Sequence, residues 1–440
     1  MTRIAKIKPH PISVPLNDPV WTAHEELTSS SVIVVEVRTD DGLTGYGQIH
    51  GSPMKAICAW VERFGEIVRG MDALAHVAVW DRLFSLTCPR PGGIAGADGL
   101  PPPLPRGERP QIMAAIGGID IALWDIKGKH AGLPVWRVLG GEPRPIPTYA
   151  TGGYYRPGAP DKVYAEELAG FVKAGYRAVK LKTGAGSPAD EAKRVRTVRE
   201  AIGKDISLML DMNAPYDVDG CIAFARGVEP LDIYWLEEPL HWYLQPADFV
   251  RLAAATSIPL AHGERELTRF TVRDFIATGA IRYVQFDSTR AAGFTEGLRV
   301  AALAEQHAVM IAPHTAPELH AHLVAALPRC GYGVESHGDA ARNPLSHHLL
   351  VGGPETRDSF VHLNDKPGFG VEIDWEYARR YAAGSRRAAA TRGPRHPSSC
   401  GASNGAGACR SPGSPGAGPC SCPTSARRPA ATDGDTRTRA

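Results

Sequence analysis

The chain has 440 residues, of which 43% are hydrophobic, and a formal net charge of +2. A chain of this length and composition can bury a large core and form more than one domain. Its nearly balanced charge argues against nucleic acid or a membrane surface as a partner, and no apolar stretch is long enough to span a bilayer. No secretory signal precedes the first strand pattern, so we expect a cytoplasmic protein.

Within the first third of the chain, residues 88–110 differ from their surroundings because they are rich in Gly and Pro. This composition favours turns over helices and strands and predicts a long surface loop. Such a loop can close over a substrate and exclude water. Composition alone does not require that role, so we expect an ordinary solvent-exposed loop.

Residues 146–335 alternate between short apolar runs and helix-like patterns, with one run about every 30 residues. Helix-like patterns such as 161–174 and 300–307 separate the runs. Alternating strands and helices at this spacing predict a parallel α/β barrel, whose catalytic groups come from the C-terminal ends of its strands. The eight predicted strands are residues 146–151, 178–182, 207–213, 233–239, 258–264, 281–287, 308–314 and 333–335.

Three carboxylates, Asp211, Glu237 and Glu264, recur one strand–helix unit apart near the ends of three consecutive runs. Because side chains alternate along a strand, each acid shares a face with residues that would fill the barrel interior. A single buried acid in a strand is more often a salt-bridged structural residue, but three in phase predict a divalent metal site. Oxygen ligands favour Mg²⁺, with Mn²⁺ as the alternative, over zinc or copper.

Lys180 and Lys182 share the polar face of the strand before Asp211. Two lysines on one face also suit a solvated edge strand, but their position inside the repeat places them in the barrel lumen. There Lys180 would disfavour the charged form of Lys182 and lower its pKa. Lys182 is therefore a candidate base.

His314 and Asp287 end two consecutive runs on the other side of the acids. Asp287 can accept the imidazole N–H and fix the tautomer of His314. A carboxylate substrate held by the metal would then have an amine on one face and an imidazole on the other. Removing a proton next to that carboxylate creates an enediolate, which a divalent cation stabilises by several kcal/mol, and positioned acids and bases add roughly 10²–10⁴-fold each.

In combination, these motifs resemble the enolase superfamily, mandelate racemase subgroup (the mandelate racemase/muconate lactonizing enzyme family). The similarity spans residues 3 to about 382 and includes two stretches without catalytic residues, 118–141 and 368–374. The motifs that carry it are Lys180-Leu-Lys182, Asp211-Met-Asn213, Trp235-Leu-Glu237-Glu238-Pro239, Gly263-Glu264, Asp287 with His314, and Glu335.

The resemblance implies an α/β fold: a modified TIM barrel of eight parallel strands and seven helices with an α+β capping domain. We expect the capping domain in residues 1–140, the barrel in 141–340 and a segment that completes the capping domain in 341–383. The same resemblance makes Lys182 and His314 the two acid/base groups, with Asp287 completing a dyad. Homo-oligomers are common in such families, and we expect one here.

The resemblance also implies residues that contact the substrate. Glu335 would hydrogen-bond the substrate carboxylate as the enediolate forms, and Asn213 would contact substrate or a metal-bound oxygen; Lys180 is assigned to substrate binding as well. Trp21 and His24 lie in the segment 17–28, where related enzymes carry a mobile loop over the site. For these two, a specificity role and an ordinary loop are equally open.

Two reactions fit this constellation. The first is Mg²⁺-dependent dehydration of a sugar acid (aldonate, aldarate or tartrate-like) to a 2-keto-3-deoxy acid, which the resemblance favours. The alternative is racemisation or epimerisation of an α-hydroxy acid by Lys182 and His314 on opposite faces. No lysine lies directly after Asp287, at the end of the sixth predicted strand, which argues against dipeptide epimerases and cycloisomerases that use a lysine at that strand. A binding protein on a decayed barrel is disfavoured, because buried charges are costly to keep without a role.

The last segment, residues 384–440, contains no Leu, Ile, Val, Phe, Trp, Tyr or Met. Such a segment cannot bury enough apolar surface to offset its ordering entropy, so we expect a disordered low-complexity tail without a function of its own. Four of the eight cysteines lie in it, in a spacing that matches no zinc pattern.

Overall fold

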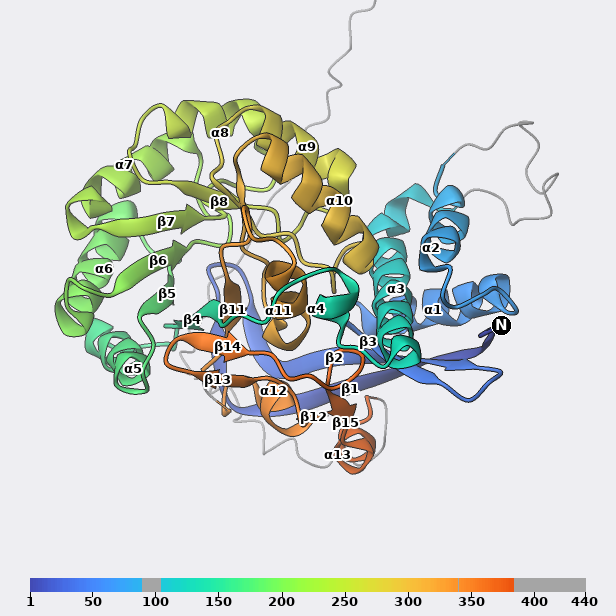
Figure 1. Ribbon diagram of the computed structural model, residues 1–440. Helices are drawn as coiled ribbons and strands as arrows, with labels where there is room; N and C mark the ends of the chain where they lie inside the picture. Colours follow the sequence, from blue (N-terminus) through green and yellow to red (C-terminus); the bar gives the residue numbers. More distant parts are fainter. Residues whose placement is uncertain (89–103, 339, 384–440) are drawn as a thin grey trace, which may run out of the picture. The chain divides into compact units, whose positions relative to one another are not determined.

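The computed structural model describes residues 1–88, 104–338 and 340–383 (Figure 1). Most of the surface loop predicted at residues 88–110 lies outside the described residues, and the tail predicted at 384–440 lies entirely outside them.

The N-terminal region forms a three-stranded antiparallel sheet with β2 in the middle. Residues 32–37 of β2 are all buried, instead of alternating between buried and exposed, because both faces of the strand are covered. Ile33 and Val35 pack towards the helices, whereas Val32 and Val34 pack towards the C-terminal segment. The strands are β1 (Ile4–Trp21), β2 (Glu26–Thr39) and β3 (Thr44–Ile49).

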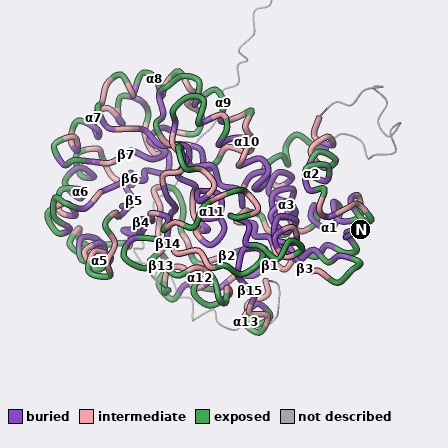
Figure 2. The backbone as a smooth tube through the Cα atoms, viewed as in Figure 1, coloured by how far each residue is buried: buried purple, intermediate pink, exposed green. Residues whose placement is uncertain are grey.

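Helices cover one face of this sheet, and the longest of them, α3, is buried along most of its length (Figure 2). Glycines on β3 and α3 let the strand and the helix approach closely: a Cβ at Gly47 would overlap the backbone of Gly118. The elements are α1 (Met54–Val68), α2 (His76–Ser85), η1 (Arg106–Glu108), α3 (Arg109–Ala131) and α4 (Val135–Val138).

The eight predicted barrel strands are confirmed. From β4 to β10 each strand pairs in parallel with the next, and β11 pairs back with β4. A parallel bridge between Ile311 and Gly331 joins β10 to the residues before β11 and closes the barrel. The strands are β4 (Ile146–Gly152), β5 (Ala178–Lys182), β6 (Ser207–Asp211), β7 (Ile233–Glu237), β8 (Leu260–His262), β9 (Tyr283–Val284), β10 (Met310–Ile311) and β11 (Val334–Ser336).

Helices connect consecutive strands and lie around the outside of the barrel (Figure 1). A large apolar cluster fills the layer between strands and helices, and a smaller one that includes Tyr149, Met209 and Trp235 fills the interior. The inward direction predicted for Met209 and Trp235 is therefore confirmed. The helices are α5 (Asp161–Lys173), α6 (Pro188–Ile202), α7 (Val218–Val228), η2 (Glu229–Leu231), α8 (Pro246–Ala253), α9 (Arg269–Ala277), α10 (Gly293–Gln306) and α11 (Pro317–Ala325).

Several strands are shorter than predicted at their C-terminal ends. β6 ends at Asp211, and Asn213 has a φ of 51°, which an extended strand does not allow. β9 ends three residues before Asp287, whose carboxylate accepts hydrogen bonds from the backbone and hydroxyl of Thr289 and so starts a turn. His314 likewise lies three residues beyond β10. These functional side chains therefore sit on the loops at the barrel mouth.

The C-terminal segment contacts both the sheet and the barrel. β14 pairs antiparallel with β4, whereas Leu345 and Ile373 pack with Val34. The division of the unit at residues 140 and 340 stays a prediction. The elements are α12 (Pro344–His348), β12 (Leu350–Val351), β13 (Glu355–Arg357), β14 (Phe360–His362), β15 (Glu372–Ile373) and α13 (Trp375–Arg380).

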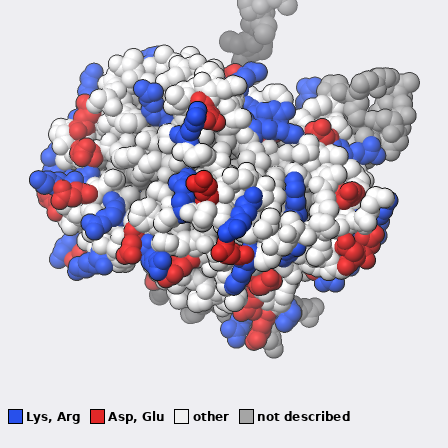
Figure 3. Space-filling view, in the orientation of Figure 1, with Lys and Arg blue, Asp and Glu red and all other residues white. Residues whose placement is uncertain are grey.

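Among the described residues, no helix is both long and apolar enough to cross a membrane. On the face seen in Figure 3, basic and acidic side chains are interspersed. That face therefore carries no broad field of one sign of the kind that attracts nucleic acid.

The close approach of β3 and α3 can be tested with one methyl group. We expect Gly47→Ala to destabilise the protein by about 1–3 kcal/mol, because the strand and the helix must separate to admit a Cβ. Chemical denaturation followed by circular dichroism measures the change. Gly107→Ala is the matched control, since a Cβ there meets nothing within 4 Å. Equal midpoints for the two variants would contradict the tight packing.

Candidate active site

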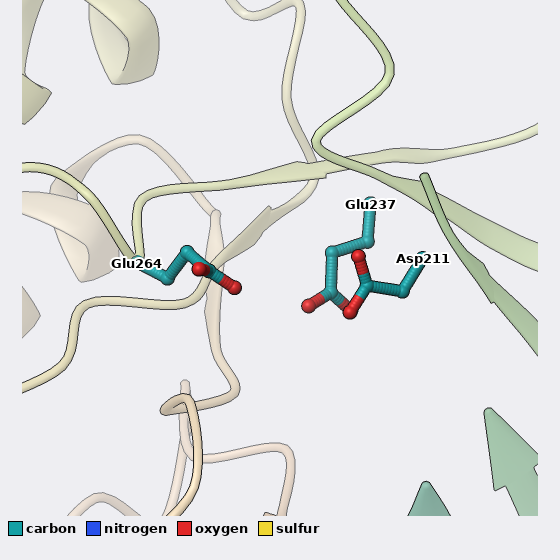
Figure 4. Close-up of side chains that lie close together, drawn as sticks. All are labelled: Asp211, Glu237 and Glu264. Atoms are coloured by element: carbon teal, nitrogen blue, oxygen red, sulfur yellow. The ribbon is translucent and has the colours of Figure 1, made fainter. Parts of the chain in front are cut away.

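Asp211, Glu237 and Glu264 meet at the barrel mouth, as predicted. Asp211 and Glu237 end β6 and β7, and Glu264 follows β8, so the tips of three neighbouring strands bring them together. One oxygen of each lies within 4.8 Å of the other two, and all three side chains are buried. In Figure 4 the carboxylates point towards a common space, with Glu264 opposite the other two.

This donor set fits a hard divalent cation. Burial and the neighbouring charge of Asp211 act to raise the pKa of Glu237, and the ammonium of Lys180 acts to lower it, so the acids gain from any positive charge placed between them. Glu264 Oε2 is buried and accepts no hydrogen bond from a described residue. Carboxylate oxygens with unused acceptor capacity are ligands that Mg²⁺ takes in proteins.

Lys180 is fully buried among these acids. Its Nζ lies 2.7 Å from Glu237 Oε1, 3.0 Å from Glu335 Oε1 and 3.4 Å from Asp211 Oδ2. Burial lowers the pKa of Lys180, but the charges of Glu237 and Glu335 outweigh it and raise the pKa well above the usual value. Lys180 therefore stays charged and holds the acids together. Direct contact with a substrate stays a prediction.

Lys182 forms an ion pair with Asp211, and its Nζ also lies 3.2 Å from Asn213 Oδ1. The expectation that its pKa is lowered is wrong for this structure. Burial and Lys180 do lower the pKa, but Asp211, Tyr154 and Glu264 together outweigh them, so the net pKa is raised. The sequence pattern indicates the like charge two residues away but not how closely the Asp211 carboxylate approaches.

His314 and Asp287 form the predicted pair, with 2.9 Å between His314 Nδ1 and Asp287 Oδ2. The other ring nitrogen, Nε2, lies 3.4 Å from Glu264 Oε2. Burial raises the pKa of Asp287, but hydrogen bonding and the charge of His314 outweigh it and keep the carboxyl ionised. The acid cluster is thus flanked by an ammonium beside Asp211 and by an imidazole beside Glu264.

The remaining predicted residues surround this group. Glu335 accepts hydrogen bonds from Thr151 and from the backbone of Thr315, so its carboxylate is held at the mouth between Lys180 and the His314 loop. His24 Nε2 lies 3.0 Å from the Ala214 carbonyl, one residue after Asn213. Trp21 pairs through its backbone with Tyr155. The segment 17–28 therefore reaches the barrel mouth; a role for Trp21 and His24 in specificity stays a prediction.

Three residues that the sequence pattern did not reveal also take part. Arg290 Nη1 lies 2.8 Å from Glu264 Oε1, and Arg265 pairs with Glu238 at 3.1 Å and approaches Glu264 at 3.9 Å. His50, from the end of β3, places Nδ1 3.3 Å from Thr315 Oγ1. The two arginines lie on the loops after β8 and β9. Their nearness in sequence to Glu264 and Asp287 is the one feature that could have indicated them.

Comparison with known families agrees with the fold and the acid cluster. The description "Mandelate racemase / muconate lactonizing enzyme, N-terminal domain" matches residues 6–140, and "Enolase C-terminal domain-like" matches residues 163–378. Together the two matches cover the N-terminal sheet with its helices and nearly all of the barrel.

Characterised relatives are similar over most of their length. The L-talarate/galactarate dehydratase of Salmonella typhimurium is 31% identical, over 84% of this chain and 88% of the relative. The D-galactonate dehydratase of Xanthomonas euvesicatoria is 33% identical, over 79% and 90%. The 3,6-anhydro-alpha-L-galactonate cycloisomerase of Streptomyces coelicolor is 30% identical, over 82% and 94%.

Solved structures give the same result. A mandelate racemase/muconate lactonizing enzyme from a marine actinobacterium, in complex with magnesium, superposes with a TM-score of 0.74 at 28% identity and covers 87% of this chain and 99% of its own. The acid cluster Asp211, Glu237 and Glu264 has the character expected of the magnesium sites in such proteins. The chain belongs to the mandelate racemase/muconate lactonizing enzyme family of the enolase superfamily.

Proposed function

We propose that the protein is a Mg²⁺-dependent dehydratase of a sugar acid, which removes the proton α to the carboxylate and eliminates the β-hydroxyl to give a 2-keto-3-deoxy acid. The observation that carries the proposal is the acid cluster of Asp211, Glu237 and Glu264 with Lys182 beside one end and His314 beside the other. Mn²⁺ is the alternative metal.

Asp211, Glu237 and Glu264 would hold the ion. When bound, it supplies positive charge that stabilises the substrate carboxylate as the α proton leaves. Lys182 and His314 lie on opposite sides of the cluster, so one can take the α proton while the other gives a proton to the departing hydroxyl. Asp287 accepts the Nδ1–H of His314 and leaves Nε2 facing the cluster.

Other buried groups prepare this arrangement. Lys180 holds Glu237 and Glu335 in place, and Arg290 holds Glu264. Although burial raises the pKa of Glu335, the positive charges around it, of which Lys180 contributes most, together hold it well below the usual value. Glu335 is therefore an ionised acceptor at the mouth. To hydrogen-bond the substrate carboxylate it would first take up a proton, after which its O–H can donate to that carboxylate.

Dehydratases of sugar acids are among the relatives reported above, which favours elimination. A cycloisomerase at 30% identity makes ring opening or closure of a sugar-acid derivative the second candidate, even though no lysine follows Asp287. Racemisation remains the outcome for a substrate without a β-hydroxyl within reach.

A screen of sugar acids and their lactones with Mg²⁺ separates these reactions. Release of a 2-keto acid supports dehydration. Exchange of the α proton in ²H₂O with loss of optical purity and no keto acid supports racemisation, and isomerisation of an anhydro sugar acid or a lactone without loss of water supports cycloisomerisation. Metal binding without any of these reactions would contradict the proposal.

The metal site can be tested without a substrate. We expect Asp211→Asn, Glu237→Gln and Glu264→Gln each to weaken Mg²⁺ binding more than about tenfold, because each replaces an anionic ligand oxygen with a neutral one and the affinity of a hard cation depends on the charge of its ligands. Isothermal titration calorimetry measures the affinity. Glu318→Gln is the control, since Glu318 is also buried but bonds to Gln48 outside the cluster. Unchanged affinity in all three variants would place the ion elsewhere.

The division of roles predicts a different pattern for the acid/base pair. Lys182→Ala and His314→Asn should each lower turnover by at least roughly 10²–10⁴-fold, because each removes a proton-transfer group. Both should bind Mg²⁺ nearly as well as the parent protein. Turnover is followed by keto-acid release, with Lys162→Ala on the exposed face of α5 as the control. A large loss of Mg²⁺ affinity in either variant would show that the roles are assigned wrongly.

A further inference from the structure

A cavity of about 180 Å³, lined by both polar and apolar side chains, lies between β2 and the barrel mouth. It adjoins the candidate active site, because Thr315 on its wall follows His314 and His337 lies two residues after Glu335. The N-terminal sheet contributes hydroxyl groups to the opposite wall. The residues of the lining that matter here are Ser29, Ser30, Ser31, His50, Glu318 and Arg342.

Arg342 differs from the other arginines at this mouth. Arg265 and Arg290 are both paired with glutamates, whereas Arg342 forms no ion pair or hydrogen bond with any residue in the described part of the chain. Its Nε is buried without a partner there, and its guanidinium lies over the Tyr154 ring, 4.0 Å from the centroid. An unpartnered charged donor is costly, and a carboxylate that binds two of its N–H groups would relieve that cost.

The Tyr154 ring lies near both Arg342 and the candidate acid/base residue Lys182. The same ring lies 5.3 Å from Lys182 Nζ, and its hydroxyl lies 3.2 Å from His337 Nε2. The ring is thus in contact with Lys182 and with Arg342. The distances of Lys182 and Arg342 are both measured to the same ring centroid, so Arg342 Cζ lies at most 9.3 Å (5.3 Å plus 4.0 Å) from Lys182 Nζ. An extended six-carbon diacid is of comparable length.

The other titratable groups of the cavity bring no second fixed positive charge. Burial lowers the pKa of His50 to about 4 and that of His337 to about 3, so both rings are neutral near pH 7. Burial raises the pKa of Glu318, whose carboxyl accepts a hydrogen bond from Gln48. Neutral imidazoles and serine hydroxyls suit the hydroxyl groups of a polyol chain.

We propose that Arg342 binds the distal carboxylate of the substrate, so that the sugar acid is a diacid (an aldarate) and the cavity holds its far end. This assignment rests on the proposed function, because it takes the acid cluster as the site of the first carboxylate. One relative is named for the diacids talarate and galactarate and another for the monoacid galactonate, so the names of the relatives do not decide between a diacid and a monoacid substrate.

The test compares matched ligands that differ only at the far end: galactarate with galactonate, glucarate with gluconate, and mannarate with mannonate. Isothermal titration calorimetry on the full chain with Mg²⁺ measures each affinity. The variants are Arg342→Met, which removes the charge at similar length, and Arg342→Lys, which keeps it. Arg357→Met is the control, because Arg357 is exposed on β13.

We expect at least one diacid to bind about tenfold or more tighter than its partner monoacid. Arg342→Met should weaken that diacid about 10- to 100-fold, with a change of less than about threefold for the monoacid, because a charge-assisted hydrogen bond is lost at one end only. Arg342→Lys should restore part of the loss. No diacid binding, a preference for monoacids, or discrimination that survives in Arg342→Met would overturn the assignment.

These results are distinct from a failure of the proposed function. Dehydration of aldonates without any effect of Arg342 would overturn the diacid assignment and leave the dehydratase proposal intact. Diacid binding that depends on Arg342 but yields no keto acid would support the diacid assignment and contradict the dehydratase proposal.

Discussion

The repulsion between Asp211, Glu237 and Glu264 is the constraint on which the rest of the site depends. Three carboxylates buried within 4.8 Å of one another would be unfavourable without positive charge nearby. The chain supplies it from both flanks, through two lysines of β5 and two basic groups on the loops after β9 and β10. These four residues are Lys180, Lys182, Arg290 and His314. The groups that make burial of the acids tolerable therefore include the two that can move protons.

The barrel and most of the acid cluster could be predicted from the sequence, because two repeating patterns determine them: the strand–helix repeat and the alternation of side chains along a strand. The repeat of strand and helix places Asp211, Glu237 and Glu264 at neighbouring strand tips, and the alternation along β6 and β7 points Asp211 and Glu237 inward with Met209 and Trp235. In β8 the interior residue is Ala261, so Glu264 reaches the cluster through the positive-φ backbone of Gly263 and not through the alternation. Parallel pairing of adjacent strands then brings together residues that are far apart in the chain. The eight strands and the positions of Asp211 and Glu237 needed no knowledge of the loops.

What could not be predicted depends on loop geometry and on partners from distant segments. The left-handed backbone at Asn213 and the turn that Asp287 starts both end the strands early. The raised pKa of Lys182 follows from how closely Asp211 approaches it, and spacing alone does not give that distance. Arg342 belongs to no periodic element, so its position over Tyr154 is a property of the folded chain.

The contacts of His50 have a mechanical consequence. Its backbone N–H donates to the Thr289 carbonyl at 3.2 Å, and its ring lies 3.3 Å from the Thr315 hydroxyl. These threonines closely follow the loop positions of Asp287 and His314, so the N-terminal sheet is tied to both halves of the dyad. If the whole sheet moved away from the barrel as a rigid lid, it would pull on both loops at once. Substrate entry that leaves the His314–Asp287 dyad intact therefore requires movement of smaller segments at the rim of the barrel mouth.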